Sequence, residues 1–263
     1  RMGKPCFCTT KSRIDFGDSA HMHECCFMIY YLLIRSVRMV FVTGDLHMPI
    51  DRGKLEEKHF PLQNKMTKED YLVVCGDCAA VWDGGEHDAQ AQQWLQERNF
   101  TTLYVDGNHE NHDLLDAMPV REWNGGHVHE VAEGILHLMR GQVFTIQGKR
   151  FFTMGGGYSI DKSFRVEGIS WWERELPSVA EEQHALANLA LHDNQVDFII
   201  THTAPSEIIK HYYMRKGELE FNAFLESIRK HITYEHWYFG HVHIDRDIDK
   251  KHTSLYREIR QII

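Results

Sequence analysis

Five short polar clusters hold the residues of this chain whose types and spacing could do chemistry, and each cluster follows an apolar run. In chain order they are GDLH at 44–47, GD at 76–77, GNHE at 107–110, THT at 201–203 and GHVH at 240–243. Together they offer carboxylate, imidazole and carboxamide groups, which suit borderline divalent metals such as Mn, Fe, Zn or Co. Two metals held close together need a bridging ligand, and a carboxylate has two oxygens for that purpose. The inventory therefore favours a two-metal site of the kind that cleaves phosphoesters.

No cluster alone establishes such a site. A Gly-Asp pair after a strand is usually only a turn, because both residue types favour turn geometry. The GNHE and GHVH clusters are the more specific pieces. What supports a joint site is that all five clusters occur in order, each directly after a predicted strand.

The elements that must position these clusters are predicted as short buried strands. Apolar, β-rich runs occupy residues 39–43, 71–75, 101–105, 196–200 and 234–239. Asp77 follows Asp45 by 32 positions, and Asn108 follows Asp77 by 31, a spacing that suits successive βαβ units. Ligands of open α/β sheets bind beyond the carboxyl ends of the strands. We therefore expect the five loops to meet at one crevice.

The rest of the chain predicts a second sheet and a set of outer helices. Strand-like runs at 135–139, 143–146 and 150–154, with a turn at 147–149, indicate antiparallel pairing. Ser178, with Glu181 three positions on, predicts a capping box. Helices are expected at 86–98, 178–192, 206–215 and 218–231, and two more strands within 244–263. The expected fold class is α/β, with mixed sheets and helices outside them.

The clusters resemble the pattern of the calcineurin-like metallophosphoesterase family: Asp-x-His, Gly-Asp, Gly-Asn-His-Asp/Glu, a lone His, then Gly-His-x-His. The resemblance covers about residues 39–243, and the THTAP stretch at 201–205 resembles a bacterial and phage subgroup. It implies a four-layer α/β/β/α sandwich. It also implies two divalent metal ions (Mn, Fe, Zn, Co or Ni, with Mn expected in vitro). One metal would be held by Asp45, His47, Asp77 and His243, and the other by Asp77, Asn108, His202 and His241.

The same resemblance implies a mechanism. Asp77 would bridge the metals, which lower the pKa of a shared water so that hydroxide attacks phosphorus. His109 would bind no metal and would act as general acid on the leaving oxygen, so His109, Asp77 and Asn108 are the expected catalytic residues. The expected substrate is a small phosphomonoester or phosphodiester, or a phosphoprotein. The alternatives are a nuclease, and a binding scaffold that lost catalysis; the complete ligand set argues against the scaffold.

Bulk properties narrow the partners. The formal net charge of −9 and pI of about 6.1 disfavour non-specific binding of nucleic acid. No stretch approaches the roughly 20 apolar residues of a membrane span, so no membrane partner is expected. Six cysteines, including the adjacent Cys25-Cys26 pair, do not form a disulfide-framework pattern. We expect a reducing, cytoplasmic location; the oligomeric state stays open.

The domain is predicted to begin near Met39, where the first clean strand opens. Residues 1–38 are Cys-rich and lack sustained periodicity. We therefore interpret 1–38 as a dispensable N-terminal extension or an upstream-translated segment, and 39–263 as the metallophosphoesterase domain.

Several neighbouring residues carry expectations of their own. Met48 stands where the family usually has Gly, and could narrow the site. Arg140 and Arg165 could contact a substrate phosphate, but solvated surface is the favoured interpretation of both. The triple glycine at 155–157 is interpreted as a flexible rim loop, because no helix start or Lys follows it.

A second His-x-His pattern, His127 and His129, is interpreted as surface strand, because no Gly-led buried strand precedes it. Cys75 and Cys78 have the spacing of a metal or redox pair, but are interpreted as small buried hydrophobes. The Trp171-Trp172 pair is left open between lining the substrate mouth and packing.

Overall fold

Two mixed β-sheets lie face to face at the centre of the computed structural model, which describes residues 38–213 and 216–263. In the seven-stranded sheet the order is β13-β1-β2-β3-β6-β5-β4. Its parallel strands are β1 (Val40–Thr43), β2 (Tyr71–Val74), β3 (Thr101–Tyr104) and β6 (Ile135–Leu138). Its antiparallel strands are β4 (Val120–Trp123), β5 (Gly126–Ala132) and β13 (Arg260–Gln261). The sheet therefore combines parallel βαβ-type pairing with a β-hairpin.

The six-stranded sheet has the order β11-β12-β10-β9-β8-β7. Its parallel strands are β8 (Lys149–Met154), β9 (Phe198–Thr201), β10 (His236–Phe239) and β12 (His252–Ser254). Two antiparallel strands, β7 (Gln142–Ile146) and β11 (Arg246–Asp247), complete it. The predicted hairpin around residues 147–149 is confirmed as the β7–β8 pair.

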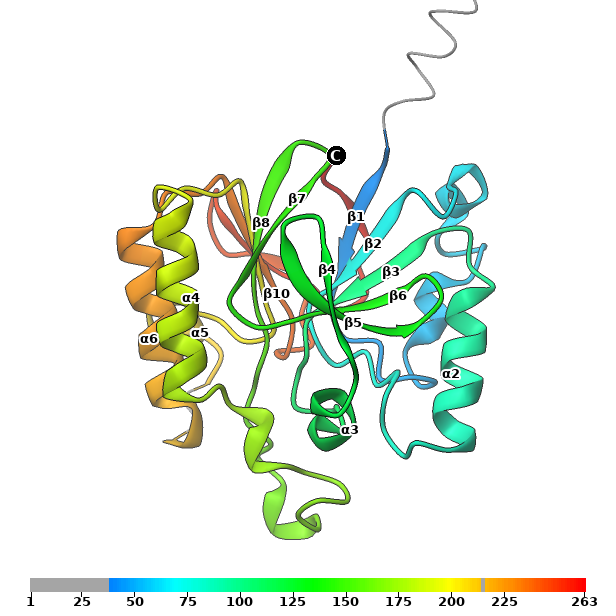
Figure 1. Ribbon diagram of the computed structural model, residues 1–263, viewed down its shortest axis with the longest axis horizontal. Coiled ribbons are helices and arrows are strands. Elements are labelled where there is room, and N and C mark those ends of the chain that lie inside the picture. The colour runs from blue at the N-terminus through cyan, green and yellow to red at the C-terminus, as the bar shows by residue number, and fades with distance from the viewer. Residues whose placement is uncertain (1–37, 214–215) are drawn as a thin grey trace, which may run out of the picture. The chain divides into compact units, whose positions relative to one another are not determined.

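Helices cover the outer face of each sheet (Figure 1). Beside the seven-stranded sheet lies α2 (Glu86–Gln96), and the short α3 (His112–Asp116) follows β3. The other sheet is covered by α4 (Val179–Leu191), α5 (Ser206–Ile209) and α6 (Leu219–His231). Single 3-10 turns are η1 (Arg52–Leu55), η2 (Pro61–Lys65), η3 (Lys162–Phe164), η4 (Glu173–Glu175) and η5 (Lys216–Glu218). The predicted α/β/β/α sandwich is confirmed.

Alternating side chains of the strands fill two different apolar layers. In β1, Val40 and Val42 point into the layer between the sheets, whereas Phe41 points into the layer beneath α2. This alternation follows from the two-residue period of a strand. Because both faces are covered, the strands are apolar throughout, as the sequence pattern predicts for buried strands. Full burial of one such side chain contributes roughly 1.5–3 kcal/mol.

Element boundaries agree with the sequence at some places and differ at others. The capping box at Ser178 is present, with Ser178 Oγ accepting from Glu181 N. The helix expected at 206–215 is too long: α5 ends at Ile209, where Tyr212 N donates to Ile209 O and the chain turns tightly. Residues 214–215 lie outside the described residues. The tail forms three short strands rather than two, because β13 crosses back and covers the free edge of β1.

The predicted extension, residues 1–38, lies outside the described residues apart from Arg38. From Arg38 to Ile263 the chain forms one unit. Within the described ranges, no helix is both long and apolar enough to cross a membrane.

Candidate dinuclear metal site

The predicted ligand residues come together where strands of both sheets end. Asp45 and His47 follow β1, Asp77 follows β2 and Asn108 follows β3. From the other sheet, His202 follows β9, and both His241 and His243 follow β10. The two sheets thus contribute ligands to one place, as the carboxyl ends of parallel strands do in open α/β folds.

Left-handed backbone at four of these residues aims the side chains inward. His47, Asp77, His241 and His243 have φ values of 37°, 51°, 66° and 53°. Such values cost a non-glycine residue of order 1–3 kcal/mol each, and they concentrate at functional sites. The surrounding backbone holds them: the amides of Leu46 and His47 both donate to the Asp77 carbonyl, at 2.9 and 2.8 Å. The strained turns are therefore fixed before any ligand arrives.

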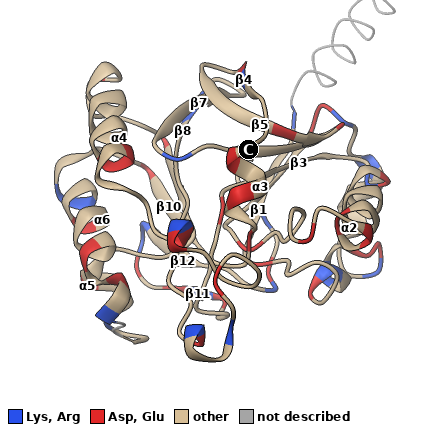
Figure 2. Ribbon diagram, turned by 60° about the horizontal axis from the view of Figure 1, so that its bottom comes forward, with Lys and Arg blue, Asp and Glu red and all other residues tan. Residues whose placement is uncertain are grey.

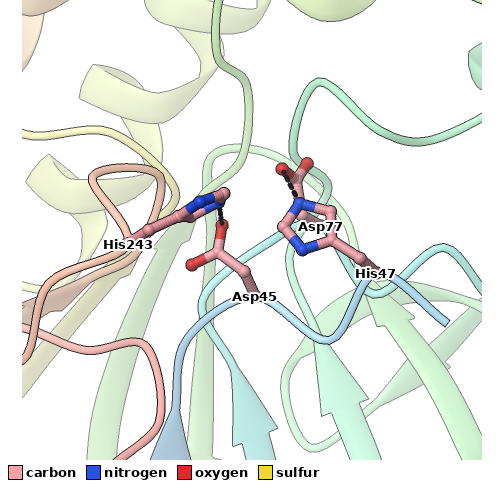
Figure 3. A group of neighbouring side chains, drawn as sticks. All are labelled: Asp45, His47, Asp77 and His243. Carbon is pink, nitrogen blue, oxygen red and sulfur yellow. Dashed lines mark hydrogen bonds and ion pairs between the residues drawn. The ribbon is translucent and has the colours of Figure 1, made fainter. Parts of the chain in front are cut away.

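The first group of potential ligands is Asp45, His47, Asp77 and His243, whose donor atoms lie within 4.8 Å of one another. Figure 3 shows these four side chains pointing toward one another. The His47 Nε2 atom lies 3.1 Å from Asp77 Oδ2, and His243 Nε2 lies 3.6 Å from Asp45 Oδ1. This group coincides with the predicted first metal position.

The second group is Asp77, His202 and His241, again with donor atoms within 4.8 Å. The Nε2 atom of His202 lies 3.3 Å from Asp77 Oδ2 and 3.2 Å from Asn108 Oδ1. Asn108 therefore stands beside this group, where the second metal is predicted. Asp77 belongs to both groups, which is the geometry that a bridging carboxylate requires.

The two buried carboxylates of the site, Asp45 and Asp77, need positive charge beside them. Asp45 and Asp77 are fully buried, and within residues 38–213 and 216–263 their ion pairs are to histidines. Burial alone would raise the Asp77 pKa, but the neighbouring histidine charges hold it well below its usual range. Conversely, burial would lower the pKa of His47 and His202, yet Asp77 raises them to about 9 and about 10. The positive charge of protonated histidines thus balances the two carboxylates. The donor set fits two divalent cations, which would supply that positive charge in place of the protons.

Outer hydrogen bonds fix the ring orientation of two of the histidines. His47 Nδ1–H donates to Asp51 Oδ2 at 2.8 Å, and His202 Nδ1–H donates to the Cys75 carbonyl at 2.8 Å. Both rings therefore direct Nε2 into the site, as metal-binding histidines commonly do. The His243 ring stacks on Tyr256, with centroids 4.7 Å apart. Asp51 and Tyr256 were not identified from the sequence, although an acidic residue four positions after His47 was a visible signal.

His109 lies beside the two groups and belongs to neither of them. Its side chain lines a pocket of about 370 Å³, whose other lining residues are Asp77, Asn108, Tyr158, Ile160, Asp161, Arg165, Tyr213, His241, Val242 and His243. Burial, together with the positive charge of Arg165, lowers the pKa of His109. Trp82, which the sequence did not single out, stacks on the His109 ring at 6.2 Å. The neutral imidazole is therefore enclosed but still borders the pocket.

The interpretation of Arg165 as solvated surface is wrong. Its side chain is only 15% exposed, and Nη2 lies 3.2 Å from His109 Nε2. Asp161 and the Ser170 carbonyl hold the guanidinium at 2.8 and 3.0 Å, which aims it into the pocket. The spacing of four between Asp161 and Arg165 was the available sequence signal.

The surface interpretation of Arg140 is also wrong, because this side chain is buried on the Asp106 carboxylate. Arg140 Nε donates to Asp106 Oδ2 at 2.8 Å. His129, interpreted as surface strand, is likewise buried, and its Nδ1 lies 3.1 Å from that of His137; its neighbour His127 is exposed. These groups form a polar network beneath the GNHE loop.

The triple glycine at 155–157 is buried, so the rim-loop interpretation is wrong. A Cβ on Gly157 would lie 2.8 Å from the His202 ring, so the absent side chain leaves room for a ligand.

Met48 does not narrow the pocket, since it is buried in the apolar layer beneath α2. Cys75 and Cys78 are buried free thiols, as predicted. Trp172 packs edge-on against Trp82 at 5.5 Å.

Comparisons with known proteins agree with this geometry. The family described as Calcineurin-like phosphoesterase matches residues 39–245. A similar curated protein is the lariat debranching enzyme of Schizosaccharomyces pombe, 25% identical over 206 residues. That alignment covers 67% of this chain and 43% of the relative, so the chain spans less than half of the relative's length. The matched region contains all five clusters, and the chain belongs to the calcineurin-like phosphoesterase family.

Proposed function

We propose that this chain hydrolyses phosphoester bonds at a dinuclear metal site made of the two groups that share Asp77. The observation that carries the proposal is that one buried carboxylate, Asp77, belongs to both groups, which together contain six predicted ligands, with Asn108 beside the second group. Membership of the phosphoesterase family supports the reaction class. When bound, two divalent cations would acidify water and neutralise charge on the phosphoryl group. We expect Mn²⁺ to serve in vitro, and Fe, Zn, Co and Ni are the other candidates.

The chain's own residues would then position the phosphate and supply a proton. In this structure the Arg165 Nη2 atom lies 3.2 Å from Nε2 of the neutral His109 ring. Phosphoryl oxygens would be better acceptors for the guanidinium, because its geometry matches theirs. That exchange would free His109 Nε2 to take up a proton from solvent water in the pocket, and the leaving oxygen would then receive that proton. A positioned proton donor contributes typically about 10²–10⁴-fold.

The pocket volume of about 370 Å³ supports a small phosphoester, or the phosphorylated side chain of a protein. A nuclease is the second candidate, because the name of the Schizosaccharomyces pombe relative refers to lariats. The net charge of −9 weighs against it. Figure 2 shows acidic and basic positions interspersed over the helices and loops, rather than one basic face.

A metal-reconstitution screen tests the proposal. Metal-free protein would be loaded with Mn, Fe, Co, Ni or Zn and given an aryl phosphomonoester, a bis-aryl phosphodiester, nucleotides, a phosphopeptide and an RNA oligonucleotide. We expect metal-dependent hydrolysis of at least one small ester, abolished by chelator and restored by the metal. Cleavage of RNA alone would favour the nuclease. No hydrolysis with any metal would favour the binding scaffold.

A further inference from the structure

Glu175 is a completely buried carboxylate that the proposed chemistry does not use. It lies in η4, and its exposed fraction is 0%. Burying a charge is costly unless hydrogen bonds and an opposite charge compensate it. Here Oε2 accepts from Ser159 N at 3.1 Å and lies 3.1 Å from Lys162 Nζ. Lys162 and the Ser159 amide both approach this one oxygen as donors, and a carboxylate can only accept hydrogen bonds.

This acceptor fixes the direction of the next hydrogen bond. The Ser159 hydroxyl lies 2.8 Å from Glu175 Oε1 and must donate its single proton there. Ser159 Oγ can then only accept from its other neighbour, Asn108 Nδ2, which lies 3.2 Å away. The two hydrogen bonds therefore have one direction: the Asn108 amide donates to Ser159, and Ser159 donates to Glu175.

The polarity matters because the two ends of a carboxamide differ chemically. With the NH₂ of Asn108 committed to Ser159, its Oδ1 faces His202 Nε2 at 3.2 Å, where the second metal is predicted. The reversed amide would present two N–H donors there, and an N–H cannot bind a cation. The choice between the two orientations rests on the hydrogen-bond network.

We propose that Glu175, acting through Ser159, is a positioning residue that holds the Asn108 carboxamide with its oxygen toward the second metal. This inference rests on the proposed metal site, and it adds a function for a segment that none of the five clusters includes. The same carboxylate holds Lys162, three positions before Arg165. Ligand orientation and the segment that carries Arg165 therefore share one buried anchor.

Glu175→Gln and Ser159→Ala test the proposal with metal binding as the readout. The Gln amide can donate to Ser159, which frees the hydroxyl to donate to Asn108 Oδ1 and permits the reversed orientation. Titration of metal-free protein with Mn²⁺ by calorimetry, at fixed pH, gives stoichiometry and affinity for each metal. We expect one of the two binding events to lose about 10–100-fold in affinity, the usual effect of removing a partner that orients a ligand. The other event, assigned to Asp45, His47, Asp77 and His243, should stay within about threefold.

Two controls separate orientation from general damage. Ser159→Thr keeps the hydroxyl and should restore most of the lost affinity. Ser178→Ala makes the same chemical change at the cap of α4 and should lower thermal stability without changing Mn²⁺ affinity. Wild-type affinity in folded Glu175→Gln and Ser159→Ala variants would overturn the proposal, as would a wild-type protein that binds only one Mn²⁺. Two bound metals without hydrolysis would instead refute the phosphoesterase function and leave the titration valid.

Discussion

At the scale of single residues, Asp77 has the largest predicted effect, because it is the carboxylate common to both ligand groups. Asp77→Asn should reduce bound metal from two ions to well below one, measured by elemental analysis after reconstitution. Metal stabilisation of the reaction is worth several kcal/mol, so kcat/KM should fall by about 10³-fold or more. His243→Ala, which removes a ligand of one group only, is the matched control and should retain the second ion. Two bound ions in Asp77→Asn would contradict the bridging assignment.

His109 is predicted to act on protons rather than metal. His109→Ala should slow turnover by about 10²–10⁴-fold for a substrate with a poor leaving group, because the leaving oxygen then receives no proton. An aryl ester with a good leaving group should be affected much less, and the metal content should remain two. Unchanged turnover of the poor-leaving-group substrate would remove His109 from the mechanism.

The ligand histidines predict how metal affinity depends on pH. In the metal-free protein, Asp77 outweighs burial and raises the pKa of His47 and His202 to about 9 and about 10. Their ordinary pKa is 6.5, so folding of the metal-free protein gains stability that is complete below pH 6.5 and is lost as pH rises through 9–10. A metal must displace these protons. Apparent Mn²⁺ affinity should therefore rise steadily from pH 6.5 to 9, measured by chelator competition; a flat profile would contradict the pKa shifts.

At the scale of elements, the network under the GNHE loop is the clearest structural prediction. Burial would raise the pKa of Asp106, but Arg140 holds it well below its usual range. Arg140→Met leaves that carboxylate without its guanidinium, so unfolding free energy should fall by about 3–5 kcal/mol. Thermal unfolding would show a Tm lower by roughly 6–20 °C. The control is Arg174→Met, at a partly exposed pair with Asp116, which should lower the unfolding free energy by about 1 kcal/mol or less. Equal losses of unfolding free energy in the two variants would contradict a special contribution from the buried network.

The sequence predicted the strands and the meeting of the polar loops well, because both depend on local pattern. Apolar runs such as 71–75 mark buried strands, and each polar cluster follows its strand directly. The position of Arg165 in the pocket was not predicted because its contact with His109 spans 56 positions. No local sequence feature distinguishes an arginine held by other residues from a solvated one. The burial of His129 was not predicted for a related reason. It follows from the pairing of β5 with β6, which a His-x-His pattern does not indicate.

At the scale of the whole molecule, the two-sheet architecture explains why the site needs most of the chain. One sheet supplies Asp45, Asp77 and Asn108, and the other supplies His202 and His241. No single sheet contains a complete group for the proposed second metal, so the proposed ligands meet only after the sheets pack. The apolar layer between the sheets therefore supports the proposed chemistry as well as the fold.

The prediction that residues 1–38 are dispensable also belongs to this scale, and the start of the described fold shows what a truncation must keep. Met39 N donates to Asp70 Oδ1 at 2.7 Å, and β1 begins at the next residue. A chain starting at Met39 replaces that amide by an ammonium, which can still donate to Asp70. We therefore expect the 39–263 protein to remain soluble, to unfold within about 3 °C of the full chain, and to show the proposed metal-dependent hydrolysis to the same extent as the full chain. A chain starting at Thr43 loses Val40 and Val42 from the central layer, at roughly 1.5–3 kcal/mol each, and should not fold. Insolubility of the 39–263 protein, measured beside that control, would place residues 1–38 within the folding unit.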